Sequence, residues 1–439
     1  MAWLAFAVSA CATRAADGDT VPPPLVVSST EQLVEALQPV NAGRRIQIEQ
    51  GDYAIDRPLH VPDGATLEGG GVMKLDAYGV PGGFEPGTET SLRVTAGFAG
   101  NVLTLGHGSV VRGLRVLDLA NPPSQPSLRQ GNVVYVASRE PGDTVSASVI
   151  ECELVNPNAV GFSDLGPHGH GLVALTLNPN LGAPPAAHEG ARISVRLQSS
   201  IVRTHTGAVV FANNFATRGD VTVLLEDNRL EGYLTVGGGV SRPDAVTDSV
   251  MRIESRRNRY LRSGRDRYGW LLLGGSTSPH FLEPGIPGAA RASVSVDSTD
   301  DRIEGFHQGI QASAARRVGA RSSLLMDNRL DLQLRGTLIR TAGDGAADLV
   351  LHGTSSETDQ AESPGEFPAG DGNVLRVRME GVSGSGVRRN VYGHVVGPAR
   401  SGNQGSGNRL EFDGDQSSFE SSNPDLDPPP AAKFFRLNP

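Results

Sequence analysis

A strip of arginines between residues 256 and 270, RRNRYLRSGRDRYGW, carries the densest group of chemically useful side chains in this 439-residue sequence. Its cations are Arg256, Arg257, Arg259, Arg262, Arg265 and Arg267, and its aromatic residues are Tyr260, Tyr268 and Trp270. Guanidinium forks match carboxylates and sulfates, and aromatic faces pack against sugar rings. The strip therefore predicts binding of an acidic polysaccharide, with Arg256, Arg259, Arg262, Arg265, Tyr260 and Trp270 as contacts. The alternative is a solvated corner in which Asp227, Glu254 or Asp266 pairs with the arginines and Trp270 fills the core.

Two histidines, His168 and His170, stand two residues apart in SDLGPHGHGL, with Asp164 close by. Alternate residues of an extended segment share a face, so two imidazoles and a carboxylate can hold a metal or move a proton. A metal would need a third ligand, for which His205 is the candidate. The glycines around the histidines fit an exposed loop equally well.

A third cluster, DSTDDRIEGFHQG at residues 297–309, offers Asp300, Asp301, Glu304 and His307 as catalytic groups. Paired carboxylates act as acid and base in glycoside cleavage. Asp300 and Asp301 also stand where Asp-Asn pairs stand in sister units, at 227–228 and 327–328. That repeated position favours a structural corner instead.

The elements that position these residues are short strands that recur along the chain. Runs such as ISVRL, VTVLL, VMRI, VSVD, SLLM and LVLH begin at residues 193, 221, 250, 294, 323 and 349, which are 28, 29, 44, 29 and 26 residues apart. A polar corner, a glycine and a second strand follow each of the first five runs. Such a unit cannot bury its own apolar face, so stacked units are expected to form rungs of parallel sheets.

The N-terminal part of the repeat, residues 28–71, resembles the opening of right-handed parallel β-helix proteins of the pectin lyase-like type. An amphipathic helix, SSTEQLVEALQPV, precedes a strand-rich coil, IQIEQGDYAIDRPLHVPDGATLEG. Ser29 and Gln32 fit a capping box, and Leu33, Val34 and Leu37 form an apolar stripe. The resemblance implies an all-β fold, a single-stranded right-handed parallel β-helix with an N-terminal capping helix, and the count of repeated units gives about ten rungs. It also implies that a lyase of this type would hold Ca²⁺ with acidic residues and abstract a proton with an arginine.

Four insertions interrupt the repeat at equivalent places. They are residues 178–191, 237–248, 274–291 and 353–372. In a solenoid, insertions at one point of the unit emerge on one side, so we expect a ridge of loops there.

The N-terminus reads as an export segment. An apolar stretch from Trp3 to Ala10 leads into Cys11, and Val8-Ser9-Ala10-Cys11 resembles the lipobox of bacterial lipoproteins, in which the cysteine is lipidated. Cys152 is the only other cysteine and is expected to be a buried core residue. The expected organisation is a signal and linker at 1–27, a β-helix domain at 28–412, and an extended or disordered tail at 413–439.

Composition narrows the class of partner. The 55 glycines and 29 prolines favour many turns, and a net charge of −9 argues against a general nucleic-acid binder. The first hypothesis is an exported, lipid-anchored surface protein that binds carbohydrate and contacts membrane only through its anchor. The alternative is a polysaccharide lyase or glycoside hydrolase. Oligomeric state, substrate and metal dependence stay open.

Overall fold

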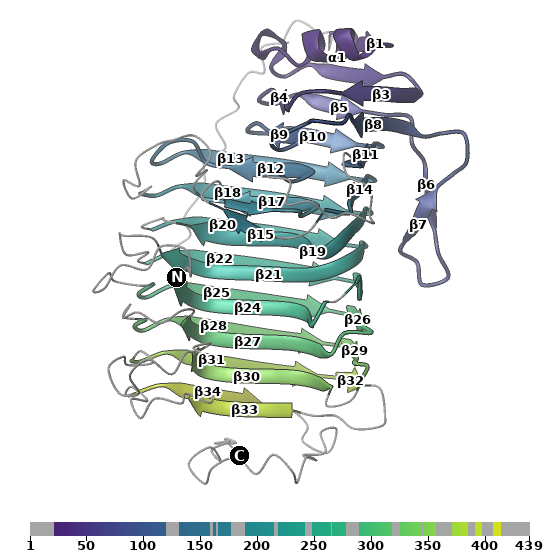
Figure 1. Ribbon diagram of the computed structural model, residues 1–439. Coiled ribbons are helices and arrows are strands. Elements are labelled where there is room, and N and C mark those ends of the chain that lie inside the picture. The colour runs from purple at the N-terminus through teal and green to yellow at the C-terminus, as the bar shows by residue number, and fades with distance from the viewer. Residues whose placement is uncertain are drawn as a thin grey trace, which may run out of the picture.

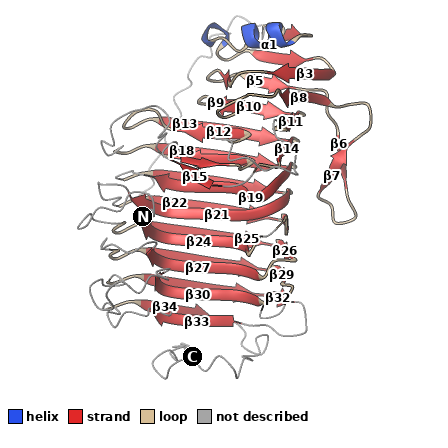
Figure 2. Ribbon diagram, in the orientation of Figure 1, coloured by secondary structure: helices blue, strands red, loops and turns tan. Residues whose placement is uncertain are grey.

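The computed structural model describes fourteen stretches of the chain: residues 22–119, 131–158, 161–163, 166–176, 189–214, 218–241, 248–264, 266–277, 289–317, 325–343, 346–356, 371–384, 391–396 and 407–413. Within them the chain winds into stacked coils, as Figures 1 and 2 show. Each coil crosses three faces in the order A, B, C before it returns to face A one rung further along. For example, β22 on face A is followed by β23 on face B, β24 on face C and then β25 on face A.

Face A is a twelve-stranded parallel sheet. Its strands are β1 (Leu25–Val27), β2 (Arg45–Ile48), β5 (Thr66–Glu68), β10 (Ser109–Arg112), β13 (Thr144–Ile150), β18 (Arg192–Gln198), β20 (Asp220–Glu226), β22 (Val250–Arg256), β25 (Ser293–Thr299), β28 (Arg329–Arg335), β31 (Val374–Glu380) and β34 (Arg409–Asp413).

Faces B and C together form an eighteen-stranded sheet, because β19 and β21 run through both. Face B contains β3 (Gly51–Ile55), β8 (Thr90–Val94), β11 (Arg115–Leu117), β14 (Glu153–Asn156), the start of β19 (Ile201–Asn214) and of β21 (Arg229–Ser241), β23 (Arg259–Leu261), β26 (Arg302–Glu304), β29 (Leu338–Arg340) and β32 (Ser383–Gly384). Face C contains β4 (Leu59–Val61), β9 (Leu103–Leu105), β12 (Val134–Ala137), β17 (Leu172–Leu175), the rest of β19 and β21, β24 (Tyr268–Thr277), β27 (Gln308–Arg317), β30 (Ala347–Ser356) and β33 (Val391–Val396).

Alternation of side chains explains why these segments pair as rungs. In β22, Met251, Ile253 and Ser255 are buried, whereas the residues between them face outward. Because successive side chains of a strand point to opposite faces, every second residue of each coil enters the interior. One apolar core runs in this way from Val27 to Phe412. The prediction of a single-stranded parallel β-helix is confirmed.

A short helix, α1 (Thr30–Ala36), lies at the N-terminal end of the solenoid next to β1 (Figure 1). The Ser29 side chain accepts a hydrogen bond from the Gln32 N–H, as the capping box predicts. Leu33 and Leu37 are buried in the core, so the helix covers the first coil with its apolar stripe. The pairing of β1 with β2 moves the start of the β-helix to residue 25, inside the segment expected to be linker.

Three smaller elements depart from the coils. They are a 3₁₀ turn, η1 (Pro39–Asn41), and two antiparallel hairpins, β6 (Met73–Leu75) with β7 (Pro81–Phe84) and β15 (Gly161–Ser163) with β16 (Gly166–His168). The β6–β7 hairpin runs along the outside of the solenoid (Figure 1). Its tip reaches face B, where the guanidinium of Arg259 lies 4.1 Å from the Tyr78 ring centre. None of the described helices is long and apolar enough to cross a membrane.

The insertions share one corner of the coil, as expected. Each lies between a face C strand and the next face A strand, although its first residues can still belong to the face C strand. Much of each insertion, residues 178–188, 242–247, 278–288 and 357–370, lies outside the described residues. At the corner, Arg291 forms a two-pronged ion pair with Asp248 of the preceding coil, at 2.6 and 2.9 Å.

The expected repeat loses register after residue 294. Leu349 belongs to face C, and residue 323 lies outside the described part, so the next two face A strands begin at Arg329 and Val374. The cause is that Asp227-Asn228 follows a face A strand, whereas Asp327-Asn328 precedes one. Both the A-to-B corner and the C-to-A corner use a positive-φ residue followed by an inward asparagine, so the same Asp-Asn pair occurs at two different corners.

Candidate functional site

The turn from face A to face B is built from a stack of buried polar side chains. The Asn228 side chain donates to Asn258 Oδ1 at 2.8 Å, and the Asn258 side chain donates to Asp301 Oδ1 at 3.1 Å. Asp301 also accepts from the Asn258 N–H at 2.7 Å and from Ser298 Oγ at 2.7 Å. Burial raises the pKa of Asp301 to about 6. Buried neighbours donate to both carboxylate oxygens of Asp301, so Asp301 is part of a structural ladder and its predicted catalytic role is wrong.

The other predicted catalytic residues lie on different surfaces. Asp300 occupies the exposed positive-φ position of the A-to-B turn, and Glu304 lies on face B, where it pairs with Arg259 at 2.7 Å. His307 lies in the turn from face B to face C. They do not form one catalytic group with the buried Asp301.

His170 lies several coils earlier and is buried, 1% exposed. Its Nδ1 lies 3.1 Å from the Gly207 carbonyl oxygen. The side chain of His168 and the whole of Asp164 lie outside the described part of the structure. Within that part, no group of three or more histidine, cysteine, aspartate or glutamate side chains is arranged to hold a metal ion.

The arginine strip is divided over three surfaces. Arg256 ends β22 on face A and pairs with Glu254, and Arg257 lies in the A-to-B turn. Arg259 lies on face B under the β6–β7 hairpin, 3.6 Å from Asp76. Arg262 and Arg267 follow towards face C, and Arg265 lies outside the described residues. The strip is thus not a single binding surface, because its chain wraps around the coil.

Tyr260 and Trp270 are core residues, each 0% exposed. Their rings meet edge to face with centres 5.2 Å apart, and the Tyr260 hydroxyl lies 2.8 Å from Ser255 Oγ. Their predicted contact with carbohydrate is wrong, because they occupy inward positions of β23 and β24. The alternative, in which Trp270 fills the core, is confirmed. Cys152 is buried as predicted, and burial raises the pKa of its thiol to about 12.

The outer surface of face A carries a groove of about 330 Å³ over β10, β13, β18 and β20. Its floor is rich in hydroxyl groups: Ser146, Ser194 and Thr222 stand directly opposite one another on neighbouring strands. Ser148 and Arg196 form the adjacent row. The volume is at the lower end of the range of small-ligand sites.

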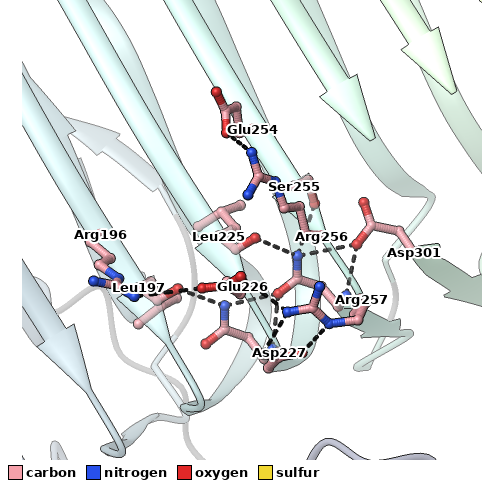
Figure 3. A network of polar contacts seen from close by, with 12 residues as sticks. Arg196, Leu197, Leu225, Glu226, Asp227, Glu254, Ser255, Arg256, Arg257 and Asp301 are labelled. Atoms are coloured by element: carbon pink, nitrogen blue, oxygen red, sulfur yellow. Dashed lines mark hydrogen bonds and ion pairs between the residues drawn. The ribbon is translucent and has the colours of Figure 1, made fainter. Parts of the chain in front are cut away.

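Arg196 supplies the charge of this groove. Its side chain is 44% exposed, and its ion pair is a long one, 3.6 Å to Glu226 on the next strand. Figure 3 shows Arg196 at one end of a polar network that continues through Glu226 to Arg257 and Asp227. Hydroxyls and one guanidinium fork on a shallow groove can bind sugar hydroxyls and an acidic substituent. The sequence signal that indicates this groove is a serine or threonine at an outward position of three successive face A strands, between inward apolar residues.

A second chemically distinct group is Asp266, in the turn from face B to face C. It is 3% exposed, and among the described residues its Oδ1 has no hydrogen-bond partner, while its Oδ2 lies 3.4 Å from the Ser263 N–H. Burial raises the pKa of Asp266 to about 8. Burial, with the nearby charge of Asp266, raises the pKa of Tyr233 to about 12. A carboxyl group that keeps its proton at neutral pH can act as a general acid.

The sequence interpretation missed this property of Asp266 and treated the residue only as an ion-pair partner of the arginines. Nothing in the letters SGRDRYG indicates burial. The Ser263 hydroxyl fixes this turn against an earlier coil, because it donates to the Thr204 carbonyl oxygen at 2.5 Å. That contact joins residues far apart in the sequence, so local patterns do not predict it.

No family model matches the sequence, and no curated protein matches it. Among solved structures, a similar one is the Dettilon tailspike protein, with 11% identity and a TM-score of 0.38; the match covers 86% of this chain and 64% of the tailspike. Another is the A-module of a mannuronan C-5 epimerase from Azotobacter vinelandii, with 12% identity and a TM-score of 0.37 over 89% of this chain and 96% of the module. By its own strand pairings, the chain is a parallel β-helix protein.

Proposed function

We propose that this protein binds carbohydrate along the outer surface of face A, with an acidic polysaccharide as the preferred ligand. The groove over β10 to β20 supports this proposal, because it combines a row of hydroxyls with the exposed guanidinium of Arg196. The row of Ser146, Ser194 and Thr222 runs along the solenoid axis, so a linear sugar chain laid on it meets a hydroxyl at each of three successive strands. Strands are about 4.8 Å apart.

Replacing Arg196 with glutamine is expected to lower the affinity for an acidic oligosaccharide about tenfold or more, since a charged hydrogen-bond donor is lost. Titration calorimetry with oligogalacturonate measures the effect, and an uncharged galactose oligomer of equal length should bind both forms within twofold. Arg329→Gln is the matched control, because Arg329 is similarly exposed on face A and pairs with Asp331, away from the groove. Equal affinity of Arg196→Gln and the unchanged protein for oligogalacturonate contradicts the proposal.

We also propose that the protein is exported and anchored through Cys11, which lies outside the described residues. The support is the apolar run that ends at Val8-Ser9-Ala10-Cys11. In cells fed a fatty-acid analogue, Cys11→Ala should lose the label and leave the membrane fraction, whereas Cys152→Ala should keep both. An anchor is ruled out if the label persists in Cys11→Ala.

A second candidate function is enzymatic cleavage of a polysaccharide, as a lyase or glycoside hydrolase. One observation favours it: Asp266 is a buried carboxyl group with an unpartnered oxygen among the described residues and a pKa of about 8. Such a group can deliver a proton to a leaving sugar oxygen. Asp266→Asn keeps the shape and removes the proton donor, so it is the variant that tests this candidate.

A further inference from the structure

Glu226, the acidic partner of Arg196, is shared with a second arginine. Glu226 ends β20 on face A and is partly buried, 16% exposed. Arg257 donates to its Oε1 at 3.0 Å, whereas the Arg196 guanidinium lies 3.6 Å from its Oε2. Figure 3 shows Glu226 between these two cations. The shorter contact indicates that Glu226 is held mainly by Arg257.

The fold fixes the position of Arg257. Its Nε and Nη2 donate to the two carboxylate oxygens of Asp227 at 2.7 and 2.9 Å, a two-pronged geometry. Asp227 and Arg257 occupy the same positive-φ position in neighbouring coils, with φ of 55° and 54°. The next residue in each coil is a buried asparagine of the ladder, Asn228 or Asn258. The stacking of the ladder therefore sets the distance between Arg257 and Glu226.

The other charged side chains near Glu226 are engaged elsewhere. Arg256 stands opposite Glu226 in the strand register but pairs with Glu254 on its own strand. Asp220, at the far end of β20, lies away from Glu226 and pairs with Arg252 at 3.0 Å. Competition for Glu226 is thus between Arg196 and Arg257.

We propose that Arg257 is a positioning residue for the anion specificity of the groove. By holding Glu226, it leaves the Arg196 guanidinium able to exchange its long contact with Glu226 for a carboxylate or sulfate of the bound sugar. Without Arg257, Glu226 turns to Arg196 and competes with the ligand. This inference rests on the proposed carbohydrate binding at Arg196.

A double-mutant cycle tests the inference with oligogalacturonate as the probe. Arg257→Gln should lower its affinity and Glu226→Gln should raise it, each about threefold, the scale of a partly exposed ion pair. The double variant should match Glu226→Gln alone, because Arg257 acts through Glu226. Arg257→Lys, which keeps the charge, should recover part of the affinity. Affinity for the uncharged galactose oligomer should stay constant throughout.

Asp220→Asn is the matched control, because it makes the same change in net charge on the same strand as Glu226→Gln. An equal gain in affinity from Asp220→Asn means that net charge alone acts, which overturns the inference. An unchanged affinity in Arg257→Gln, or a double variant as weak as Arg257→Gln, overturns it as well. In both cases Arg196→Gln still loses affinity if the proposed function holds. If Arg196→Gln binds normally, the proposed function itself has failed.

Discussion

Replacing Asp266 with asparagine is expected to stabilise the protein by about 4 kcal/mol at pH 7. The unfolded carboxyl group has a pKa near 3.9, and each pH unit between that value and pH 7 costs the folded protein about 1.4 kcal/mol. Burial raises the folded-state pKa of Asp266 to about 8. A carboxyl with a raised folded pKa contributes its full stability below about pH 4, and that contribution is lost as the pH rises to about 8. The gain from Asp266→Asn should therefore vanish near pH 4. Denaturant unfolding at pH 4, 7 and 9 measures it.

The control for this experiment is Asp220→Asn. Asp220 is 39% exposed and pairs with Arg252 on the surface, so its replacement should change stability by less than about 1 kcal/mol at any pH. If Asp266→Asn behaves like Asp220→Asn, then Asp266 is solvated and loses its proton near the ordinary pKa of an aspartate, about 3.9.

The same variant decides between the two candidate functions. If Asp266 is a general acid, the unchanged protein should release reducing or unsaturated sugar ends from an acidic polysaccharide. Asp266→Asn should abolish this release although it is more stable. A residue that lowers stability but is required for activity is the pattern found at catalytic sites. If neither protein releases such ends, or both release them equally, an acid role for Asp266 is contradicted.

Replacing Trp270 with alanine is expected to destabilise the protein by about 3 to 5 kcal/mol, the range for truncation of a buried aromatic residue. Trp270 is 0% exposed and packs edge to face on Tyr260. Trp270→Phe should lose much less, because among the described residues the indole N–H has no hydrogen-bond partner. Unfolding in denaturant measures both changes. Oligogalacturonate affinity at a temperature where the variants are folded should be unchanged, because Trp270 faces the core.

An exposed aromatic residue provides the comparison. Tyr78, on the β6–β7 hairpin, is 54% exposed, so Tyr78→Ala should lower stability by less than about 1 kcal/mol. A specific loss of sugar binding in Trp270→Ala, with stability unchanged, would restore the stacking role that the sequence suggested.

The fold could be predicted because its signals are local. Period-two burial in segments such as VMRIESR, the capping serine at Ser29 and the recurrence of turn residues each act within a few residues. The register was harder to predict. Two corners use the same Asp-Asn turn, and the lengths of the connections between them vary, so sequence spacing alone does not show which corner a pair occupies.

The candidate site was predicted only in part, and the reason is also geometric. A continuous run of arginines looks like one surface in the sequence, but a chain that turns two corners within fifteen residues places Arg256 and Arg259 on different faces. The burial of Asp266 and the shared position of Glu226 depend on contacts between residues 30 to 59 apart in the sequence. Such contacts leave no periodic trace in the sequence.

The asparagine ladder bears on how a protein of this shape changes its length over generations. Ser200 donates its N–H to Asn228 Oδ1 at 3.0 Å, and Asn228 donates its N–H to Asn258 Oδ1 at 2.9 Å. Each of these coils therefore presents the same acceptor to the coil before it. A gene segment that encodes one whole coil between such asparagines can be copied or deleted, and each buried amide N–H at the new junction still finds an asparagine oxygen. Adding a coil by unequal crossing-over should therefore cost less stability between these asparagines than next to Asp301, because the acceptor there is a carboxyl group whose charge depends on pH.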